Sequence, residues 1–192
     1  STGTVTQRLL AAAPALEGIP VSVFGSDRGV DPVSAPVSPA KARRGSLLPS
    51  CVVLPEGIET ECRILFEFSL ASAVALPHVT FHWRLHPVVS FENLFARYPH
   101  LRDIPPNIEL GRRSLDEDVA VSQWALYRGT TAVFKSTMQG LRPVYLGRTG
   151  EMTIDPLFGL DRWKKKIVKP EDLVQLIEAD LAGEQAEDAA DF

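Results

Sequence analysis

Three runs of mainly apolar residues, at 51–54, 79–85 and 119–126, constrain the fold of this chain more than any other feature. Helical spacing of apolar residues separates the first two runs. A short run without alternation of apolar and polar residues, such as 51–54, is typical of a strand that is buried on both faces. Strands that alternate with helices predict a parallel sheet, because a parallel connection needs a crossover that is usually a helix. The sequence therefore predicts an α/β fold with a doubly wound parallel sheet.

The other segments extend this pattern. Further helices and strands are expected, the helices at 59–74, 91–98, 131–139 and 173–181 and the strands at 108–110, 143–146 and 165–168. The Ser-x-x-Glu spacing of Ser114 and Glu117 predicts a capping box and a brief helical turn before the third run. Near the N-terminus we expect a helix at 4–16 and a strand at 19–24. The alternation favours a Rossmann-like sheet with helices on both faces.

Proline content and charge divide the chain into four parts. Residues 1–30 are interpreted as a helix and a strand, which either remain from a preceding Rossmann half or form an edge of the same sheet. Residues 31–50 contain four prolines and predict a linker, since proline interrupts a hydrogen-bonded ladder. Residues 51–182 are the expected binding domain, and the acidic residues 183–192 are an expected frayed tail.

Charge and cysteine count exclude several classes of protein. The net charge of −4 gives no support for nucleic-acid binding by the chain as a whole. Cys51 and Cys62 are too few for a disulfide scaffold or a metal site, so we expect buried thiols in a reducing, cytoplasmic compartment. No run approaches the roughly 20 apolar residues of a membrane span. The first residue is Ser1 rather than Met, so we expect a processed chain or a fragment.

Two of the apolar runs lead into turns that carry polar groups. Pro55-Glu56-Gly57 follows the first run, and Gly129-Thr130-Thr131 follows the third. Glycine permits a tight turn, and threonine hydroxyls with backbone N–H groups at a helix start suit a phosphate, although plain N-capping by threonine is the alternative. The Glu56 carboxylate either accepts hydrogen bonds from a ribose or sugar hydroxyl or stabilises the following helix N-terminus.

The second run ends at His86-Pro87. A histidine at the carboxyl end of a strand, fixed by the following proline, is placed to donate to a phosphate or carboxylate; an ordinary turn histidine is the alternative. His78, His82 and His86 do not predict zinc, because no carboxylate or cysteine spacing completes a ligand set. Arg84 and Arg128 join the candidate site on the basis of their charge and position.

These turns are expected to lie together. Ligands of an open parallel sheet bind outside the carboxyl ends of the strands, where backbone N–H groups and helix N-termini point. Because residues 56–57, 86–87 and 129–131 each follow a predicted strand, we expect them at one edge of the sheet. The sequence therefore predicts a ligand-binding edge.

A second group of basic residues lies toward the C-terminus and consists of Arg142, Arg148, Arg162 and Lys164-Lys165-Lys166. One interpretation is a solvated face. The other is electrostatic attraction of an anionic glycan or lipid head group, which predicts peripheral association with the inner face of a membrane.

Taken together, residues 50–182 resemble the C-terminal, nucleotide-sugar-binding half of a GT-B glycosyltransferase. The resemblance is to the bacterial capsule and surface-polysaccharide type, which includes sialyltransferases, Kdo transferases and polyol-phosphate polymerases. Those enzymes are similar in having a His-Pro motif after a strand and a Ser/Thr-rich turn that opens a later helix. His86-Pro87 matches the first motif and Gly129-Thr130-Thr131 the second. The resemblance implies that His86 binds or protonates the phosphate of the donor and that Thr130 and Thr131 hold the same group.

The resemblance also implies a function. The chain is expected to bind the donor nucleotide in an enzyme that transfers a sugar from a CMP- or UDP-sugar to a glycan acceptor, in surface polysaccharide biosynthesis. No metal cofactor is expected, since His86, the two threonines and helix dipoles can neutralise the leaving group. A missing N-terminal domain is the expected partner and would hold the acidic base. Two alternatives remain open: a non-catalytic nucleotide- or glycan-binding module, and a UDP-sugar epimerase-like enzyme.

Overall fold

The computed structural model of the chain describes residues 3–24, 48–160 and 162–183. The chain divides into two units, Ser1–Ala35 and Pro36–Phe192. Most of the expected linker at 31–50 and nearly all of the expected tail at 183–192 lie outside the described residues.

The first unit contains a short helix followed by a turn. Helix α1 spans Thr4–Ala11, and a single 3₁₀ turn spans Pro14–Leu16. The expected helix at 4–16 is therefore too long, because a proline within a helix removes a hydrogen bond and clashes with the preceding turn. The strand expected at 19–24 is wrong, since these residues form no strand. Instead, Gln7 Nε2 donates to Val21 O across 2.7 Å.

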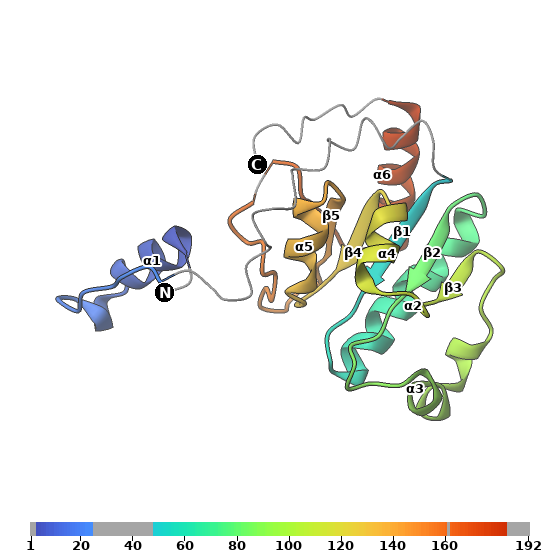
Figure 1. Ribbon diagram of the computed structural model, residues 1–192, viewed down its shortest axis with the longest axis horizontal. Helices are drawn as coiled ribbons and strands as arrows, with labels where there is room; N and C mark the ends of the chain where they lie inside the picture. The colour runs from blue at the N-terminus through green and yellow to red at the C-terminus, as the bar shows by residue number, and fades with distance from the viewer. Residues whose placement is uncertain (1–2, 25–47, 161, 184–192) are drawn as a thin grey trace. The chain divides into compact units, whose positions relative to one another are not determined.

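The second unit is built on a six-stranded sheet in which every pair of neighbouring strands is parallel (Figure 1). Its strands are β1 (Ser50–Leu54), β2 (Thr80–Trp83), β3 (Ile108–Leu110), β4 (Trp124–Tyr127), β5 (Arg142–Leu146) and β6 (Lys165–Ile167). The order is β3-β2-β1-β4-β5-β6, so the direction of strand addition reverses between β1 and β4. This is the order of a doubly wound nucleotide-binding sheet. The predicted Rossmann-like fold is confirmed.

Helices cover both faces of this sheet. They are α2 (Glu59–Ala75), α3 (Phe91–Arg97), α4 (Leu115–Val121), α5 (Ala132–Met138) and α6 (Pro170–Ala182), with a 3₁₀ turn at Pro99–Arg102. Helices α4 and α5 lie on the face turned toward the viewer in Figure 1. The expected helices at 59–74, 91–98, 131–139 and 173–181 are all present, with small shifts at their ends.

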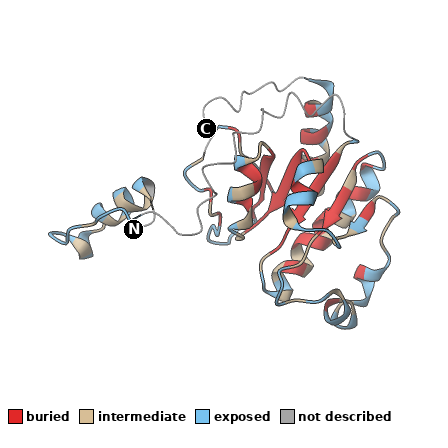
Figure 2. Ribbon diagram, viewed as in Figure 1, coloured by how far each residue is buried: buried red, intermediate tan, exposed pale blue. Residues whose placement is uncertain are grey.

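Alternate residues of the central strands pack into two separate cores. Cys51 and Val53 of β1 pack with residues of α2, α3 and α6, whereas Val52 and Leu54 pack with residues of α4 and α5. Figure 2 shows the central strands buried throughout. Because both faces are covered, β1 has no polar face, which explains its uninterrupted apolar sequence. Cys51 and Cys62 are buried free thiols, as predicted, and burial raises the pKa of each to about 12.

The third apolar run is shared between a helix and a strand. The predicted capping box is present, since Ser114 N donates to Glu117 Oε2 (2.7 Å) and Glu117 N donates to Ser114 Oγ (3.3 Å). The helix that it opens continues to Val121, and β4 begins only at Trp124. The strand expected at 119–126 is therefore wrong at its start. Apolar residues such as Val119 can face a core from a helix as well as from a strand.

A buried ion pair joins α6 to the sheet. Arg142 of β5 and Asp180 of α6 are each 2% exposed and form a salt bridge. Trp124 Nε1 of β4 also donates to Asp180 Oδ2, across 2.7 Å. Assigning Arg142 to an exposed basic patch is therefore wrong, because its guanidinium lies inside the domain. Lys164 is also mostly buried and pairs with Asp155 across 2.6 Å.

The helices of residues 3–24, 48–160 and 162–183 include none that is both long enough and apolar enough to cross a bilayer.

Replacing Asp180 with alanine is expected to lower the free energy of unfolding by about 3–5 kcal/mol, because the buried salt bridge with Arg142 and the hydrogen bond from Trp124 Nε1 would both be lost. Urea denaturation of the purified chain measures this loss. Glu178→Ala is the matched control, since Glu178 is an exposed acid on the same helix, and its effect should stay within about 0.5 kcal/mol. Equal effects of the two substitutions would contradict the assigned role of the pair.

Candidate functional site

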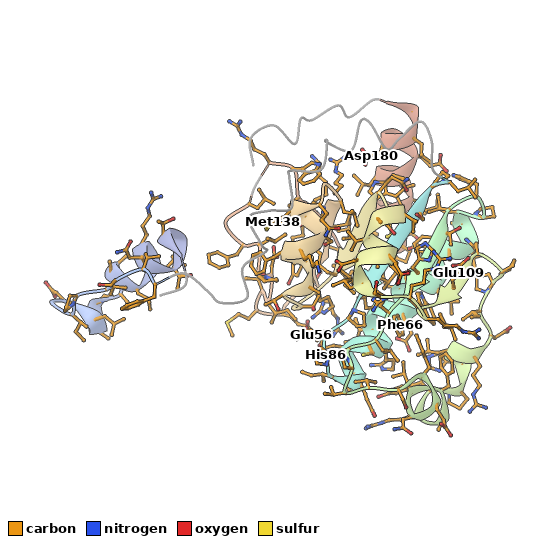
Figure 3. The ribbon with its side chains drawn as sticks, in the orientation of Figure 1. Glu56, Phe66, His86, Glu109, Met138 and Asp180 are labelled. Atoms are coloured by element: carbon orange, nitrogen blue, oxygen red, sulfur yellow. The ribbon has the colours of Figure 1, made fainter. Side chains whose placement is uncertain are left out.

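The three predicted turns follow neighbouring strands at the carboxyl edge of the sheet. His86-Pro87 follows β2, Glu56-Gly57 follows β1, and residues 129–131 follow β4, in the spatial order β2-β1-β4. The pairing of Leu54 with Tyr127 brings the ends of β1 and β4 level with each other. Figure 3 shows Glu56 and His86 at one edge and Asp180 at the opposite edge. The turns therefore meet where the strand order reverses, the usual place for a ligand in this fold.

Gly57 and His86 are in direct contact. A Cβ atom on Gly57 would lie 3.0 Å from His86 Nδ1, so the imidazole packs over the glycine. The φ angle of Gly57 is not positive, so glycine here favours the close approach of the His86 and Val88 side chains rather than a special backbone conformation. Val88 N donates to His86 Nδ1 across 3.4 Å. A neutral ring that accepts at Nδ1 carries its proton on Nε2, and His86 is exposed.

The carboxylate of Glu56 lies against Gly129. Gly129 N donates to Glu56 Oε1 across 3.1 Å, and a Cβ atom on Gly129 would lie 2.4 Å from that oxygen. Gly129 has no positive φ, and a Cβ atom there would require the flexible Glu56 carboxylate to move. Burial raises the pKa of Glu56, as does the negative charge of Glu61, against the opposing effects of Gly129 N–H and Arg128.

The two threonines of the third turn have different environments. Thr130 Oγ1 accepts a hydrogen bond from Ala132 N across 3.3 Å, which is a local side-chain turn of the capping kind. Thr131 is the N-cap residue of α5, but its side chain makes no capping hydrogen bond, and the residue is exposed. The threonine-capping alternative therefore holds for Thr130 and leaves the Thr131 hydroxyl uncommitted to the helix.

Arg128 is a structural junction behind the edge. It is 3% exposed and donates from Nε to Glu61 Oε2 (2.6 Å), from Nη1 to Leu146 O (3.1 Å) and from Nη2 to Glu151 Oε2 (3.0 Å). These bonds join the first turn of α2, the end of β5 and the segment that follows β5. All three nitrogens of the guanidinium donate to oxygens of the protein. Direct contact between Arg128 and a ligand stays a prediction.

Arg84 is directed toward α4. Its Nη1 donates to Arg113 O across 2.7 Å and forms a salt bridge with Asp118, which is 2% exposed. Arg84 thus fixes the segment after β3 against α4. Its predicted contact with a ligand also stays a prediction.

A cavity of about 330 Å³ opens beside β3. Its polar lining consists of His82, Glu109, Arg112, Arg113 and Asp118. His82 Nδ1 lies 3.3 Å from Glu109 Oε2, and burial lowers the pKa of His82 although Asp118 and Glu109 act to raise it. The sequence indicated His82 only as a rejected metal ligand. Its alternation with the core residues Phe81 and Trp83 was the signal that it faces the other side of the sheet.

In the part of the chain that the structure describes, no cluster of three or more His, Cys, Asp or Glu side chains is arranged to hold a metal ion. Metal-independent binding stays a prediction.

Comparison with known proteins gives a similarity of fold. The solved structure of the glycotransferase of kitacinnamycin covers 84% of this chain and 41% of its own length, with 14% identity and a TM-score of 0.52. A UDP-GlcNAc 2-epimerase from Methanocaldococcus jannaschii covers 74% of this chain and 41% of its own, at 11% identity and a TM-score of 0.45. KpsC, a β-Kdo 2,4 transferase from Thermosulfurimonas dismutans, covers 70% of this chain and 44% of its own length, at 14% identity and a TM-score of 0.42.

The chain thus spans less than half the length of each of these proteins. The first comparison shows a shared α/β fold. No protein-family model and no curated protein matches the sequence.

Replacing Arg128 with methionine is expected to lower the free energy of unfolding by about 1–3 kcal/mol, because Leu146 O and two carboxylates lose their donor. The loss should stay below that of a fully buried pair, since the side chains of Glu61 and Glu151 are 20% and 39% exposed. Urea denaturation measures it. Arg97→Met is the control, because Arg97 pairs with Glu59 at the surface; a loss as large in this variant would argue against the junction.

Proposed function

We propose that the chain is the donor-nucleotide-binding domain of a glycosyltransferase that uses a CMP- or UDP-sugar. The observation that carries the proposal is the meeting of residues 56–57, 86–87 and 129–131 at the reversal of the strand order. Open α/β sheets bind their ligands in the crevice at this point. The shared fold with a solved glycosyltransferase is consistent with this assignment.

In this proposal His86 and the threonine turn bind the phosphate of the donor. His86 Nε2 donates to a phosphate oxygen, and the Thr131 hydroxyl donates to the same group from the turn after β4. As the bond to the sugar breaks, negative charge develops on the leaving phosphate, and His86 stabilises it by hydrogen bonding from Nε2, or by proton transfer when the ring is an imidazolium and Nδ1 no longer accepts from Val88 N. Gly57 leaves room for the imidazole ring, and Pro87 restricts the backbone that follows it.

The nucleoside then lies toward β3. Neighbouring strands are about 4.8 Å apart, so the turn after β4 and the cavity beside β3 are separated by about 14 Å along the edge, a span that suits an extended nucleotide. The cavity volume of about 330 Å³ falls within the range of small-molecule sites. Carboxylates of Glu109 and Asp118 are suited to accept hydrogen bonds from the amino group of cytosine or from N3–H of uracil.

The wider role that we propose is sugar transfer to a glycan acceptor in surface polysaccharide biosynthesis, in the cytoplasm and together with an acceptor-binding domain. The basic residues that remain at the surface, among them Arg148, Arg162 and Lys166, are proposed to attract anionic lipid or glycan.

Calorimetric titration with CMP, CDP, UDP and GDP tests the donor site. One nucleotide should bind the wild-type chain, and His86→Ala should weaken it about tenfold or more, because a hydrogen bond to a charged group is lost. His78→Ala is the matched control, since His78 pairs with Glu178 on α6 across 3.4 Å and should not alter binding.

Absence of binding by all four nucleotides would contradict the proposal, and so would equal weakening in the two histidine variants.

A further inference from the structure

An anionic side chain of the chain itself occupies a backbone donor of the proposed phosphate site. Gly129 N donates to Glu56 Oε1 across 3.1 Å. A point at the position of a Cβ atom on Gly129 lies 2.4 Å from Oε1, 2.6 Å from Cδ and 2.8 Å from Oε2 of Glu56. The whole carboxylate therefore covers Gly129, on the side where a side chain would stand in any other residue.

The backbone of Glu56 is held in place while its side chain can rotate. Cys62 Sγ donates to Glu56 O across 3.2 Å, which ties the turn after β1 to the first turn of α2. Pro55, directly before Glu56, is buried. The carboxylate itself stands at the end of three rotatable bonds and is partly exposed. It can therefore leave Gly129 without any movement of the strand or the helix.

The charges around this carboxylate do not hold it strongly in place. From α2, Glu61 opposes its negative charge, and from the end of β4, Arg128 favours it. Arg128 is already bound to Glu61 and Glu151, and from the turn after β2 His86 lies against the adjacent Gly57. Burial and Glu61 together raise the pKa of Glu56, so its surroundings favour the protonated form more than water does.

We propose that Glu56 is a specificity-determining residue that competes with a ligand phosphate for the N–H of Gly129. The inference rests on the function proposed above. Two anions cannot share this one donor without strong repulsion, so an incoming phosphate displaces the carboxylate. A nucleotide has further contacts in the cavity beside β3 and can displace it, whereas inorganic phosphate has none. Glu56 thus excludes simple anions from the site.

The competition between Glu56 and the ligand phosphate should weaken as the pH falls. Protonation of Glu56 removes the competing charge, so nucleotide affinity should rise as the pH falls through the pKa of Glu56, which lies above its usual range. The phosphate of the ligand titrates as well. The effect of Glu56 is therefore measured as the difference in nucleotide affinity between wild type and Glu56→Gln at each pH. The titration of the ligand contributes equally to both proteins and cancels in this difference.

Calorimetry with CMP, UDP and inorganic phosphate, from about pH 5 to about pH 8, tests the inference on the full chain. Glu56→Gln keeps the shape of the side chain and removes its charge, and Glu56→Ala removes both. At neutral pH each variant should bind the nucleotide about tenfold more tightly than wild type and should bind inorganic phosphate measurably. Glu178→Gln, on α6, removes an equal charge elsewhere and should behave as wild type.

A second readout needs no ligand. The amide resonance of Gly129 should shift with pH in wild type, following the titration of Glu56, and this shift should be absent in Glu56→Gln. The same spectra show whether each variant is folded.

The outcomes separate the two claims. Nucleotide binding that is unchanged in Glu56→Gln, with the pH dependence of wild type, overturns the inference and leaves the nucleotide site standing. Weaker binding in both Glu56 variants also overturns it and assigns Glu56 to holding a ribose or sugar hydroxyl. Failure of every nucleotide to bind wild type and both variants overturns the proposed function and the inference together.

Discussion

Burial of the central strands on both faces is the constraint on which this domain depends. Neither face of β1 or β4 reaches water, because α2, α3 and α6 cover one face and α4 and α5 cover the other. Polar side chains are therefore excluded from the middle of these strands and reach water only where the strands end. This arrangement concentrates Glu56, His86 and Thr131 at a single edge of the sheet.

At that edge, ion pairs and hydrogen bonds fix the side chains that the packing of the sheet brings together. Arg128 compensates two carboxylates from different segments, Glu61 and Glu151, and its third bond fixes the end of β5. Glu56 is left with one backbone donor and with a negative neighbour. The turn after β4 thus contains a cation with three partners, and the turn after β1 beside it contains an anion with weaker compensation. Rigid positioning and a displaceable group are combined at two neighbouring turns of the same edge.

Much of the sheet could be predicted from the sequence, because the spacing of apolar residues and the residue types found in turns are local properties of the chain. The apolar run at 51–54, the capping box at Ser114 and the polar turn at 129–131 are each visible within a few residues. The boundary between α4 and β4 could not be placed, since apolar residues fit a helix or a strand equally well. The partners of Arg84 and Arg128 also could not be found, because their ion pairs join residues 34 and 67 positions apart. Arg142 was misplaced at the surface for the same reason, as its partner lies 38 residues away.

The contact between Glu56 and Gly129 spans 73 positions of the chain. A contact over that distance exists only after β1 and β4 have paired, so the edge that it belongs to is absent from the unfolded chain. Any ligand held there binds the folded domain alone, and its binding free energy adds to the stability of the fold. At about 100 times its dissociation constant, such a ligand would raise the free energy of unfolding by about 2.7 kcal/mol. The concentration of such a ligand would then shift the folding equilibrium of this domain.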